Sequence, residues 1–333
     1  MTELTVIGGG SWGTALAIVL AARFPRVRLW VYEADLAERM RATRVNDVYL
    51  PGFLLPANVE VVNEFARALD GADIVLSVMP SHLARALYEE MLPFLRPSMV
   101  FVSATKGLEN GTLLRVSEVI REVVSGHFDP RVAVISGPTF AREVAAGVPT
   151  ALVVASTDRL LADSIRNAFS GPTFRLYSNP DPVGVEVGGA VKNVVAIGAG
   201  VCHGLGLGHN ALAALITRGL AEMTRLALAM GGKAQTLAGL AGLGDLVLTC
   251  TGDLSRNRTV GLELARGRRL EDIVSSMKMV AEGVKTTNAT VNLASRFDVE
   301  TPISLQMYEM LHYGVPPRDA IRKLMERSLK GEY

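Results

Sequence analysis

The chain has 333 residues, a length that suggests one large domain or, more commonly, two. Hydrophobic residues make up 49% of it and charged residues 20%, so it can bury a sizeable core and does not have the composition of a disordered chain. The formal net charge of +1 gives no support to nucleic-acid binding or to a polybasic membrane contact. The two cysteines, Cys202 and Cys250, fit neither a metal-ligand spacing nor a disulfide framework. This cysteine usage predicts a reduced cytoplasmic protein.

The first half of the chain alternates short apolar runs, rich in β-branched residues, with segments of helix length. This alternation predicts parallel βαβ units with right-handed crossovers. The expected strands are residues 4–7, 27–32, 59–62, 74–78, 99–103 and 132–135, with a further pair at 151–155 and 174–177. The expected helices are residues 14–22, 82–92 with Ser81 as its N-cap, 113–124 and 158–169.

From about Asn179 onward the strand-like alternation stops and helical periodicity dominates. Helices are expected at residues 211–230, 262–265, 270–277, 286–294 and 304–311, and the sequence Pro180-Asp181-Pro182 marks a natural boundary. We therefore predict an α/β protein, with a Rossmann-like parallel-sheet domain over residues 1–179 followed by an all-α domain over residues 180–333.

The stretch from residue 186 to 217 is the first part of this helical domain, apolar and rich in Gly and Ala. Its length raises the question of a membrane span. However, residues 202–210 alternate Gly with His203, His209 and Asn210, which is poor for crossing lipid and typical of a loop between two buried helices. A water-soluble protein is expected.

A glycine-rich turn follows the first expected strand. Gly8, Gly10 and Gly13 have the G-x-G-x-x-G spacing, preceded by a strand and followed by a helix, which is the arrangement that places a pyrophosphate on a helix N-terminus. Glu33 ends the second strand at the distance where a carboxylate binds the adenosine ribose hydroxyls. It would repel a 2′-phosphate, so NAD is expected as cofactor, with NADP as the alternative if Arg41 or Arg44 reaches this site.

Polar residues gather at several predicted strand ends and helix starts. Lys106 and residues 137–139 follow strands, Asp245 lies in an apolar neighbourhood, and residues 255–258 combine a hydroxyl, an amide and two guanidinium groups in a way that suits an anion. Taken singly, Asp245 could be a helix cap and residues 255–258 a solvated basic turn. Together with a dinucleotide fold they suggest hydride transfer to a small phosphorylated carbonyl compound.

Lys192 is the candidate acid/base for this chemistry. It lies in a run that has no other charged residue before Arg218. One alternative is that its stem packs on apolar surface while the ammonium reaches water. The other is that burial lowers its pKa toward that of a working base. His203 and His209 lie near the same stretch, but no carboxylate partner is evident for them, and Lys192 is preferred.

Long strings in the sequence resemble the NAD(P)-dependent glycerol-3-phosphate dehydrogenases of the bacterial and soluble eukaryotic kind. The matching strings are VIGGGSWGTALA (residues 6–17), ATKGLE (104–109), ISGPTFAREVAAGVPT (135–150), GGAVKNVVAIGAG (188–200), ITRGLAEM (216–223) and AGLGDLVLTCTGDLSRNR (241–258). The resemblance implies interconversion of sn-glycerol 3-phosphate and dihydroxyacetone phosphate, and supply of glycerol 3-phosphate for glycerophospholipid synthesis. The large apolar helices suggest a homodimer, and no membrane insertion is expected. A related two-domain hydroxyacid dehydrogenase is the alternative.

The same resemblance implies roles for individual residues. Lys192 matches the catalytic lysine and Asp245 the aspartate beside it. The substrate-contacting positions match Lys106, Gly137, Thr139, Asp245, Ser255, Arg256 and Asn257. The dinucleotide-contacting positions match Gly8, Gly10, Ser11, Trp12, Gly13, Tyr32, Glu33, Tyr49, Lys106, Ala141, Arg256, Val280 and Glu282. The string WVYEAD around Glu33 looks more like the eukaryotic NAD enzymes, and the role of Asn193 stays open. No metal ligand is expected.

Overall fold

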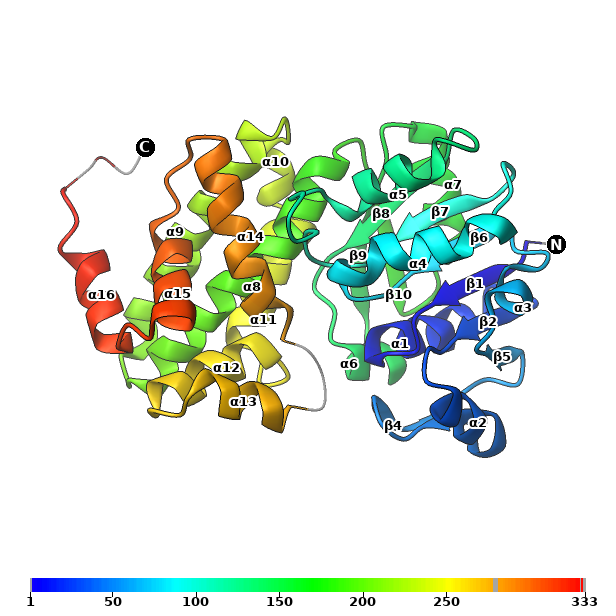
Figure 1. Cartoon of the computed structure of the whole chain (residues 1–333), viewed down its shortest axis with the longest axis horizontal. Coiled ribbons are helices and arrows are strands. Elements are labelled where there is room, and N and C mark those ends of the chain that lie inside the picture. Colours follow the sequence, from blue (N-terminus) through cyan, green and yellow to red (C-terminus); the bar gives the residue numbers. More distant parts are fainter. Residues whose placement is uncertain (1, 278–280, 330, 332–333) are drawn as a thin grey trace.

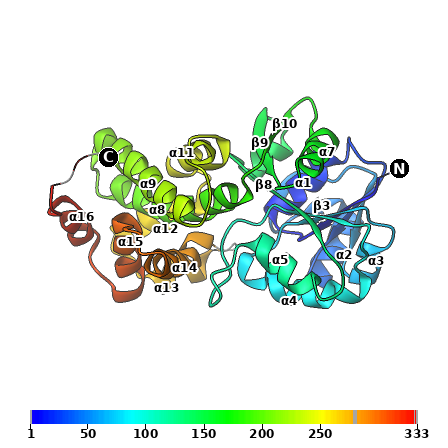
Figure 2. The ribbon, with the colours of Figure 1, turned by 90° about the horizontal axis from the view of Figure 1, so that it is seen from above.

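The computed structural model describes residues 2–277, 281–329 and 331, and arranges them as a sheet domain beside a helical domain (Figure 1). The view from above shows the two domains side by side along the long axis of the molecule (Figure 2). The predicted fold class, a Rossmann-like α/β domain followed by an all-α domain, is confirmed. The last strand ends at Asn179 and the first helix of the second domain begins at Pro182, while the boundary between residues 179 and 180 stays a prediction.

The sheet domain is built on eight strands in the order β10-β9-β8-β7-β6-β1-β2-β5. Their bounds are β1 Leu4–Ile7, β2 Val27–Trp30, β5 Val59–Val62, β6 Ile74–Ser77, β7 Val100–Ser103, β8 Arg131–Ser136, β9 Thr150–Ala155 and β10 Phe174–Asn179. The strands β5, β2, β1, β6, β7 and β8, in sheet order, run parallel to one another. They read as continuous apolar runs because a parallel sheet is covered on both faces.

The prediction that all the strands run parallel is wrong at one point. Strand β9 pairs antiparallel with β8, and β10 pairs parallel with β9, so these two strands run against the rest of the sheet. The connection from β8 to β9 holds only the short helix α6 (Ala141–Ala145), whose length of about 8 Å is too short to run back along a strand as a crossover helix does. The sequence analysis also missed the antiparallel hairpin of β3 (Val45–Asn46) and β4 (Leu50–Leu54).

Helices cover both faces of the sheet. On one face Leu16 of α1 (Ser11–Leu20) and Leu161 of α7 (Arg159–Phe169) join a core with alternate strand residues. On the other face pack α3 (Phe65–Leu69), α4 (Ala84–Met91) and α5 (Val116–Val124). Helix α2 (Ala34–Thr43) follows β2.

Two predicted helix starts need correction. The helix expected from residue 113 begins at Val116, because Leu113 has a left-handed backbone with φ of 65° and cannot continue a helix. Ser81 makes no capping hydrogen bond, because it is the first residue of a 3₁₀ turn, η1 (Ser81–Leu83), that precedes α4.

The helical domain is organised around α8, which is almost completely buried. Asp181 caps its first turn by accepting a hydrogen bond from the Gly184 amide at 2.8 Å, and it also accepts one from the Lys233 amide, just before α10, at 2.9 Å. The helices are α8 Pro182–Gly204, α9 Gly208–Ala229, α10 Ala234–Leu237, α11 Asp245–Thr251, α12 Arg256–Ala265, α13 Leu270–Ser276, α14 Glu282–Arg296, α15 Pro302–Tyr313 and α16 Pro317–Met325, with a single wide turn, η3 (Leu240–Gly244), before α11.

Helix α8 is long and apolar enough to cross a bilayer, yet its apolar window is 100% buried within the protein. Other helices pack around α8, as they do around the core helix of a globular domain (Figure 1). Its apolar character is therefore accounted for by burial in protein.

The two domains share apolar core. Val134, Val153 and Ala155 of the sheet pack in one cluster with Val185 of α8 and with Ala241. Leu108, from the segment after β7, is 2% exposed and packs in the main core of the helical domain. The two domains are thus joined by continuous apolar packing.

Candidate active site

Asp245 lies between two lysines from different parts of the chain. Its Oδ1 accepts a hydrogen bond from Lys192 Nζ at 2.6 Å, and its Oδ2 accepts one from Lys106 Nζ at 2.7 Å. Lys192 comes from the middle of α8, Lys106 follows β7, and Asp245 is the first residue of α11. Asp245 has no exposed surface, so its charge is balanced by the two ammonium groups and not by water.

Neighbouring groups hold both ammonium groups in place. Lys192 Nζ also donates to Thr249 Oγ1 at 2.7 Å, and Lys106 Nζ donates to Gly137 O at 3.0 Å and Thr139 Oγ1 at 3.2 Å. The sequence analysis missed Thr249. The available signal was its spacing of four residues from Asp245, which puts both side chains on one face of a helix.

The surroundings of Lys192 favour its neutral form. The residue is 5% exposed, so the reading in which its ammonium reaches water is wrong. The pKa of Lys192 is lowered to about 7: burial is the main cause, the Asp245 carboxylate opposes it, and the positive charge of Lys106 adds to the lowering. A lysine with a pKa near neutrality can both take up and release a proton at physiological pH.

The segment from Ser255 to Arg258 forms the N-cap and first turn of α12, in which Arg256 is exposed and Arg258 is half-buried. Ser255 is the N-cap of this helix, and its Oγ accepts from the Arg258 amide at 3.3 Å. Ser255 and Asn257 are buried. A helix N-terminus with an arginine beside it is an arrangement that suits an anion.

Asn193 connects this turn to its neighbours. Its Oδ1 accepts from Asn257 Nδ2 at 2.9 Å, and Asn257 Oδ1 accepts from the Gly283 amide at 2.9 Å. The two asparagines thereby tie α8, α12 and the start of α14 together. Asn193, the residue after Lys192, therefore supports the position of Asn257. The sequence left this role open.

Glu282 opens α14 beside this network. Its Oε2 atom is buried and has no hydrogen-bond partner within the described part of the chain. Burial raises the pKa of Glu282 to about 7, against the opposing charges of Arg256 and Lys285. An acceptor left in this state is available to a donor on a bound molecule. Val280, predicted to contact the cofactor, lies outside the described residues.

The glycine-rich turn between β1 and α1 has the geometry of a dinucleotide cradle. A side chain at Gly8, where φ is 127°, would meet Val78 O at 2.3 Å, and one at Gly13 would meet Gly8 O at 1.9 Å. At Gly10, by contrast, a Cβ would have no neighbour within 4 Å. The first and third glycines are therefore needed by the fold. The open space at Gly10 and the N-terminus of α1, which no described side chain caps, suit a pyrophosphate.

The remaining predicted cofactor residues lie around this turn. Ser11 and Trp12 begin α1, which packs on α6, and Ala141 begins α6. Just before α2, Glu33 Oε1 accepts a hydrogen bond from Tyr49 OH at 2.7 Å, while Tyr32 is 75% exposed.

The arginines near Glu33 differ in their engagement. Arg44 is held by the carbonyl groups of Pro56 and of Val59, the latter at 2.9 Å. Its guanidinium therefore already donates to backbone carbonyl groups in the segment that follows β4. Arg41 lies exposed in the last turn of α2.

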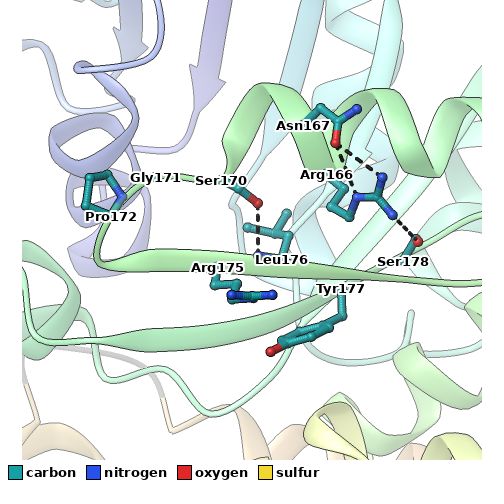
Figure 3. A pocket seen from close by; sticks show the side chains of 9 residues that line it. All are labelled: Arg166, Asn167, Ser170, Gly171, Pro172, Arg175, Leu176, Tyr177 and Ser178. Atoms are coloured by element: carbon teal, nitrogen blue, oxygen red, sulfur yellow. Dashed lines mark hydrogen bonds between the residues drawn. The ribbon is translucent and has the colours of Figure 1, made fainter.

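Other polar groups lie apart from the two lysines. His203 Nδ1 is 3.4 Å from Arg258 Nη2, and His209 is exposed near the start of α9. A pocket between α7 and the edge strand β10 has none of the predicted site residues in its lining (Figure 3). There Arg166 already donates to Asn167 and Ser178. Within the described ranges no group of three or more His, Cys, Asp or Glu side chains could hold a metal ion.

Comparison with known proteins agrees with this geometry. The model of the NAD-dependent glycerol-3-phosphate dehydrogenase N-terminus matches residues 3–162, and that of the C-terminus matches residues 181–322. A glycerol-3-phosphate dehydrogenase of Koribacter versatilis, named as NAD(P)+-dependent, is 60% identical over 329 residues, which are 98% of each chain. One of Syntrophotalea carbinolica is 55% identical over 330 residues, 99% of each chain. The crystal structure of glycerol-3-phosphate dehydrogenase from Coxiella burnetii matches with a TM-score of 0.94 and 41% identity, over 98% of this chain and 99% of that one.

Proposed function

Since the chain belongs to the NAD-dependent glycerol-3-phosphate dehydrogenase family, we propose that it interconverts sn-glycerol 3-phosphate and dihydroxyacetone phosphate. The observation that carries the proposal is the pair of lysines on Asp245, one of them buried, with a pKa near 7, at the meeting of the two domains. When bound, the nicotinamide gives or takes the hydride at C2 of the substrate.

Lys192 acts on the oxygen at C2. In the direction of reduction its ammonium polarises the ketone and donates a proton to the oxygen as the hydride arrives, and the product is the alcohol. In the direction of oxidation the neutral amine takes the hydroxyl proton as the hydride leaves. Asp245 and Thr249 orient the amine, since both already bond to Nζ.

The phosphate of the substrate is assigned to the first turn of α12. Arg256 provides a guanidinium there, and Ser255 and Asn257 provide polar groups beside the helix N-terminus. We assign Lys106, Gly137 and Thr139 to the opposite side of the substrate site. Lys106 Nζ already donates hydrogen bonds to Gly137 O and Thr139 Oγ1. Binding energy from the phosphate would orient C2 toward Lys192.

The dinucleotide is assigned to Gly8, Gly10, Ser11, Trp12 and Gly13, with Ala141, Arg256 and Glu282 toward the nicotinamide end. NAD is the proposed preferred cofactor. A 2′-phosphate would meet the Glu33 carboxylate, and Arg44, which could neutralise it, is bound to backbone carbonyls. Tyr32 and Tyr49 flank the same ribose position.

Four enzyme assays test this function. NADH oxidation is followed with dihydroxyacetone phosphate, then with NADPH in place of NADH, then with unphosphorylated dihydroxyacetone, and then with the ketone of a 3-hydroxyacid. We expect turnover with the phosphorylated ketone and a higher kcat/KM for NADH than for NADPH. Faster turnover of the 3-hydroxyacid's ketone would assign the chain to the related hydroxyacid dehydrogenases and reject this proposal.

The wider setting is also proposed. The reaction would supply glycerol 3-phosphate for glycerophospholipid synthesis in the cytoplasm, and the enzyme would act as a homodimer. Sedimentation equilibrium of the purified chain measures the second point directly, since a species of the monomer mass, 35.6 kDa, at all concentrations would reject the dimer.

A further inference from the structure

Glu186 is a buried carboxylate on α8 that the proposed mechanism does not use. It is 7% exposed. Its Oε1 accepts from the Ser117 amide at 2.9 Å, and its Oε2 accepts from Ser117 Oγ at 2.6 Å and from Arg115 Nη1 at 2.7 Å. All three donors belong to the start of α5, in the other domain. A buried ion is stable in such a place only when donors satisfy it, and here they do.

Ser117 depends on this contact in return. It is the second residue of α5, and the first amides of a helix have no acceptor within the helix. Glu186 therefore caps a helix of the sheet domain from a helix of the other domain. Burial raises the pKa of Glu186, against the opposing effects of Arg115 and Ser117.

The contact lies at one end of a segment whose other end carries Lys106. From Lys106 the chain places Leu108 in the core of the helical domain and then reaches Arg115. On the facing helix, Lys192 follows Glu186 by six residues, about 9 Å along a helix axis. The segment and α8 are thus joined at two levels, by Glu186 at one and by the Lys106–Asp245–Lys192 bridge at the other.

A close approach between these levels leaves little room for adjustment. A Cβ at Gly189 would lie 2.7 Å from Ser136 Oγ and 3.7 Å from Lys106 Cγ. Helix α8 therefore lies close to the end of β8 and to Lys106. A small shift of α8 would move Lys192 relative to these residues of the sheet domain.

We propose that Glu186 is a positioning residue, which holds α8 on the first turn of α5 and so sets Lys192 and Asp245 in register with Lys106 and the dinucleotide-binding turn for hydride transfer. This inference rests on the proposed function. Glu186 itself touches neither substrate nor cofactor. Its effect passes through the position of Lys192.

The test compares Glu186→Gln with a matched control, Glu222→Gln. Glu222 on α9 is 1% exposed and accepts bonds from the Ile303 amide at 2.6 Å, the Ser304 amide at 3.1 Å and Ser304 Oγ at 3.2 Å. It therefore makes the same kind of cap on α15, but with both partners in the helical domain. Thermal unfolding of the two variants shows how much each substitution costs in stability alone.

The kinetic readout is dihydroxyacetone phosphate reduction with NADH and with NADH deuterated at C4. For Glu186→Gln we expect kcat to fall roughly tenfold or more, because misplacement of a reacting group by about 1 Å is costly. The deuterium isotope effect on kcat should rise, while the NADH dissociation constant, measured by fluorescence, changes little. For Glu222→Gln we expect kcat to stay within about twofold of wild type.

A rescue variant and an exchange measurement complete the test. In Arg115→Gln/Glu186→Gln an amide pair can replace the ion pair, and part of the lost kcat should return. In Glu186→Ala the Ser117 amide should exchange with deuterium faster than in wild type, because its acceptor is gone.

Three results would overturn the inference: normal kcat in a folded Glu186→Gln, equal losses of kcat in both single variants, or unchanged exchange at Ser117 in Glu186→Ala. If the wild-type enzyme does not reduce dihydroxyacetone phosphate, the proposed function fails by that measurement, and the exchange rate at Ser117 still decides whether Glu186 joins the two domains.

Discussion

At the scale of single residues, the site depends on one carboxylate shared by two lysines. Asp245 accepts from both, and the distances of 2.6 Å and 2.7 Å leave no room for water between the charges. Removing Asp245 would leave two ammonium groups without their counter-ion, and removing either lysine would leave the other to balance the carboxylate. The three residues therefore act as a unit, and single substitutions will not be additive.

The first prediction concerns Lys192→Ala. We expect kcat to fall by roughly 10²- to 10⁴-fold, the usual contribution of a positioned acid/base, because alanine has no amine to exchange a proton with the substrate oxygen. The NADH dissociation constant should change far less, since the glycine-rich turn is untouched. Steady-state kinetics and fluorescence titration measure the two quantities. Near-normal turnover in this variant would reject Lys192 as the proton carrier.

The second prediction concerns pH. Because the pKa of Lys192 lies at about 7, the amine is neutral above that pH and charged below it. Oxidation of glycerol 3-phosphate needs the neutral form, so its kcat should rise as pH increases through about 7, whereas kcat for reduction should fall over the same range.

Lys106→Met supplies the control for this pH dependence. The charge of Lys106 lowers the pKa of Lys192, so its removal should move both midpoints to higher pH, at a cost in KM for the substrate. Flat profiles in both directions would show that Lys192 does not carry the proton.

At the scale of elements, α8 and α12 touch backbone to backbone. A Cβ at Gly200 would lie 1.9 Å from Arg258 O, and one at Gly261 would lie 1.9 Å from Ile197 O. Only glycine allows this separation. The contact holds the first turn of α12, with Arg256 and Asn257, against the helix that carries Lys192.

The third prediction follows from this contact. Gly200→Ala should lower the free energy of unfolding by about 1–3 kcal/mol, the usual cost of overpacking. It should also raise KM for dihydroxyacetone phosphate, because the helices must separate and the anion-binding turn moves with α12. Gly126→Ala is the matched control, since a Cβ there meets nothing within 4 Å. Urea unfolding and steady-state kinetics measure both effects, and equal behaviour of the two variants would contradict the close helix contact.

At the scale of the whole molecule, the domains are joined by shared core and not by a hinge alone. Leu108 belongs by sequence to the sheet domain and by packing to the helical one. Val134 and Val153 of the sheet share a cluster with Val185 of α8. Loss of either domain would expose apolar surface on the other.

The fourth prediction is that the full chain unfolds in one cooperative transition, with equal calorimetric and van't Hoff enthalpies. Leu108→Ala should then lower the free energy of unfolding by about 2–5 kcal/mol, without splitting the transition. Leu160→Ala is the control, because Leu160 is 80% exposed and its loss should be nearly neutral. Two separate transitions in the wild-type protein would contradict the shared core.

Much of this protein was readable from local pattern. The strands β1, β2, β5, β6, β7 and β8 follow from short apolar runs, and the glycine spacing after β1 predicts its turn, because steric limits on φ act within a few residues. The isolated charge of Lys192 in an apolar helix and the family-specific strings pointed to the site. Segments set by such local rules required no knowledge of distant neighbours.

Tertiary structure decided the rest, because the deciding contacts join residues far apart in the chain. The antiparallel direction of β9 depends on how the connecting residues 137–149 pack. The start of α5 depends on the left-handed backbone of Leu113 and on Glu186 from the other domain. Thr249 and Asn193 gain their roles only when α8, α11 and α12 meet. Above all, the pKa of Lys192 near 7 comes from burial and from two charges placed 86 and 53 residues away in the chain (192 − 106 and 245 − 192), which only the folded packing brings within hydrogen-bonding distance of one another.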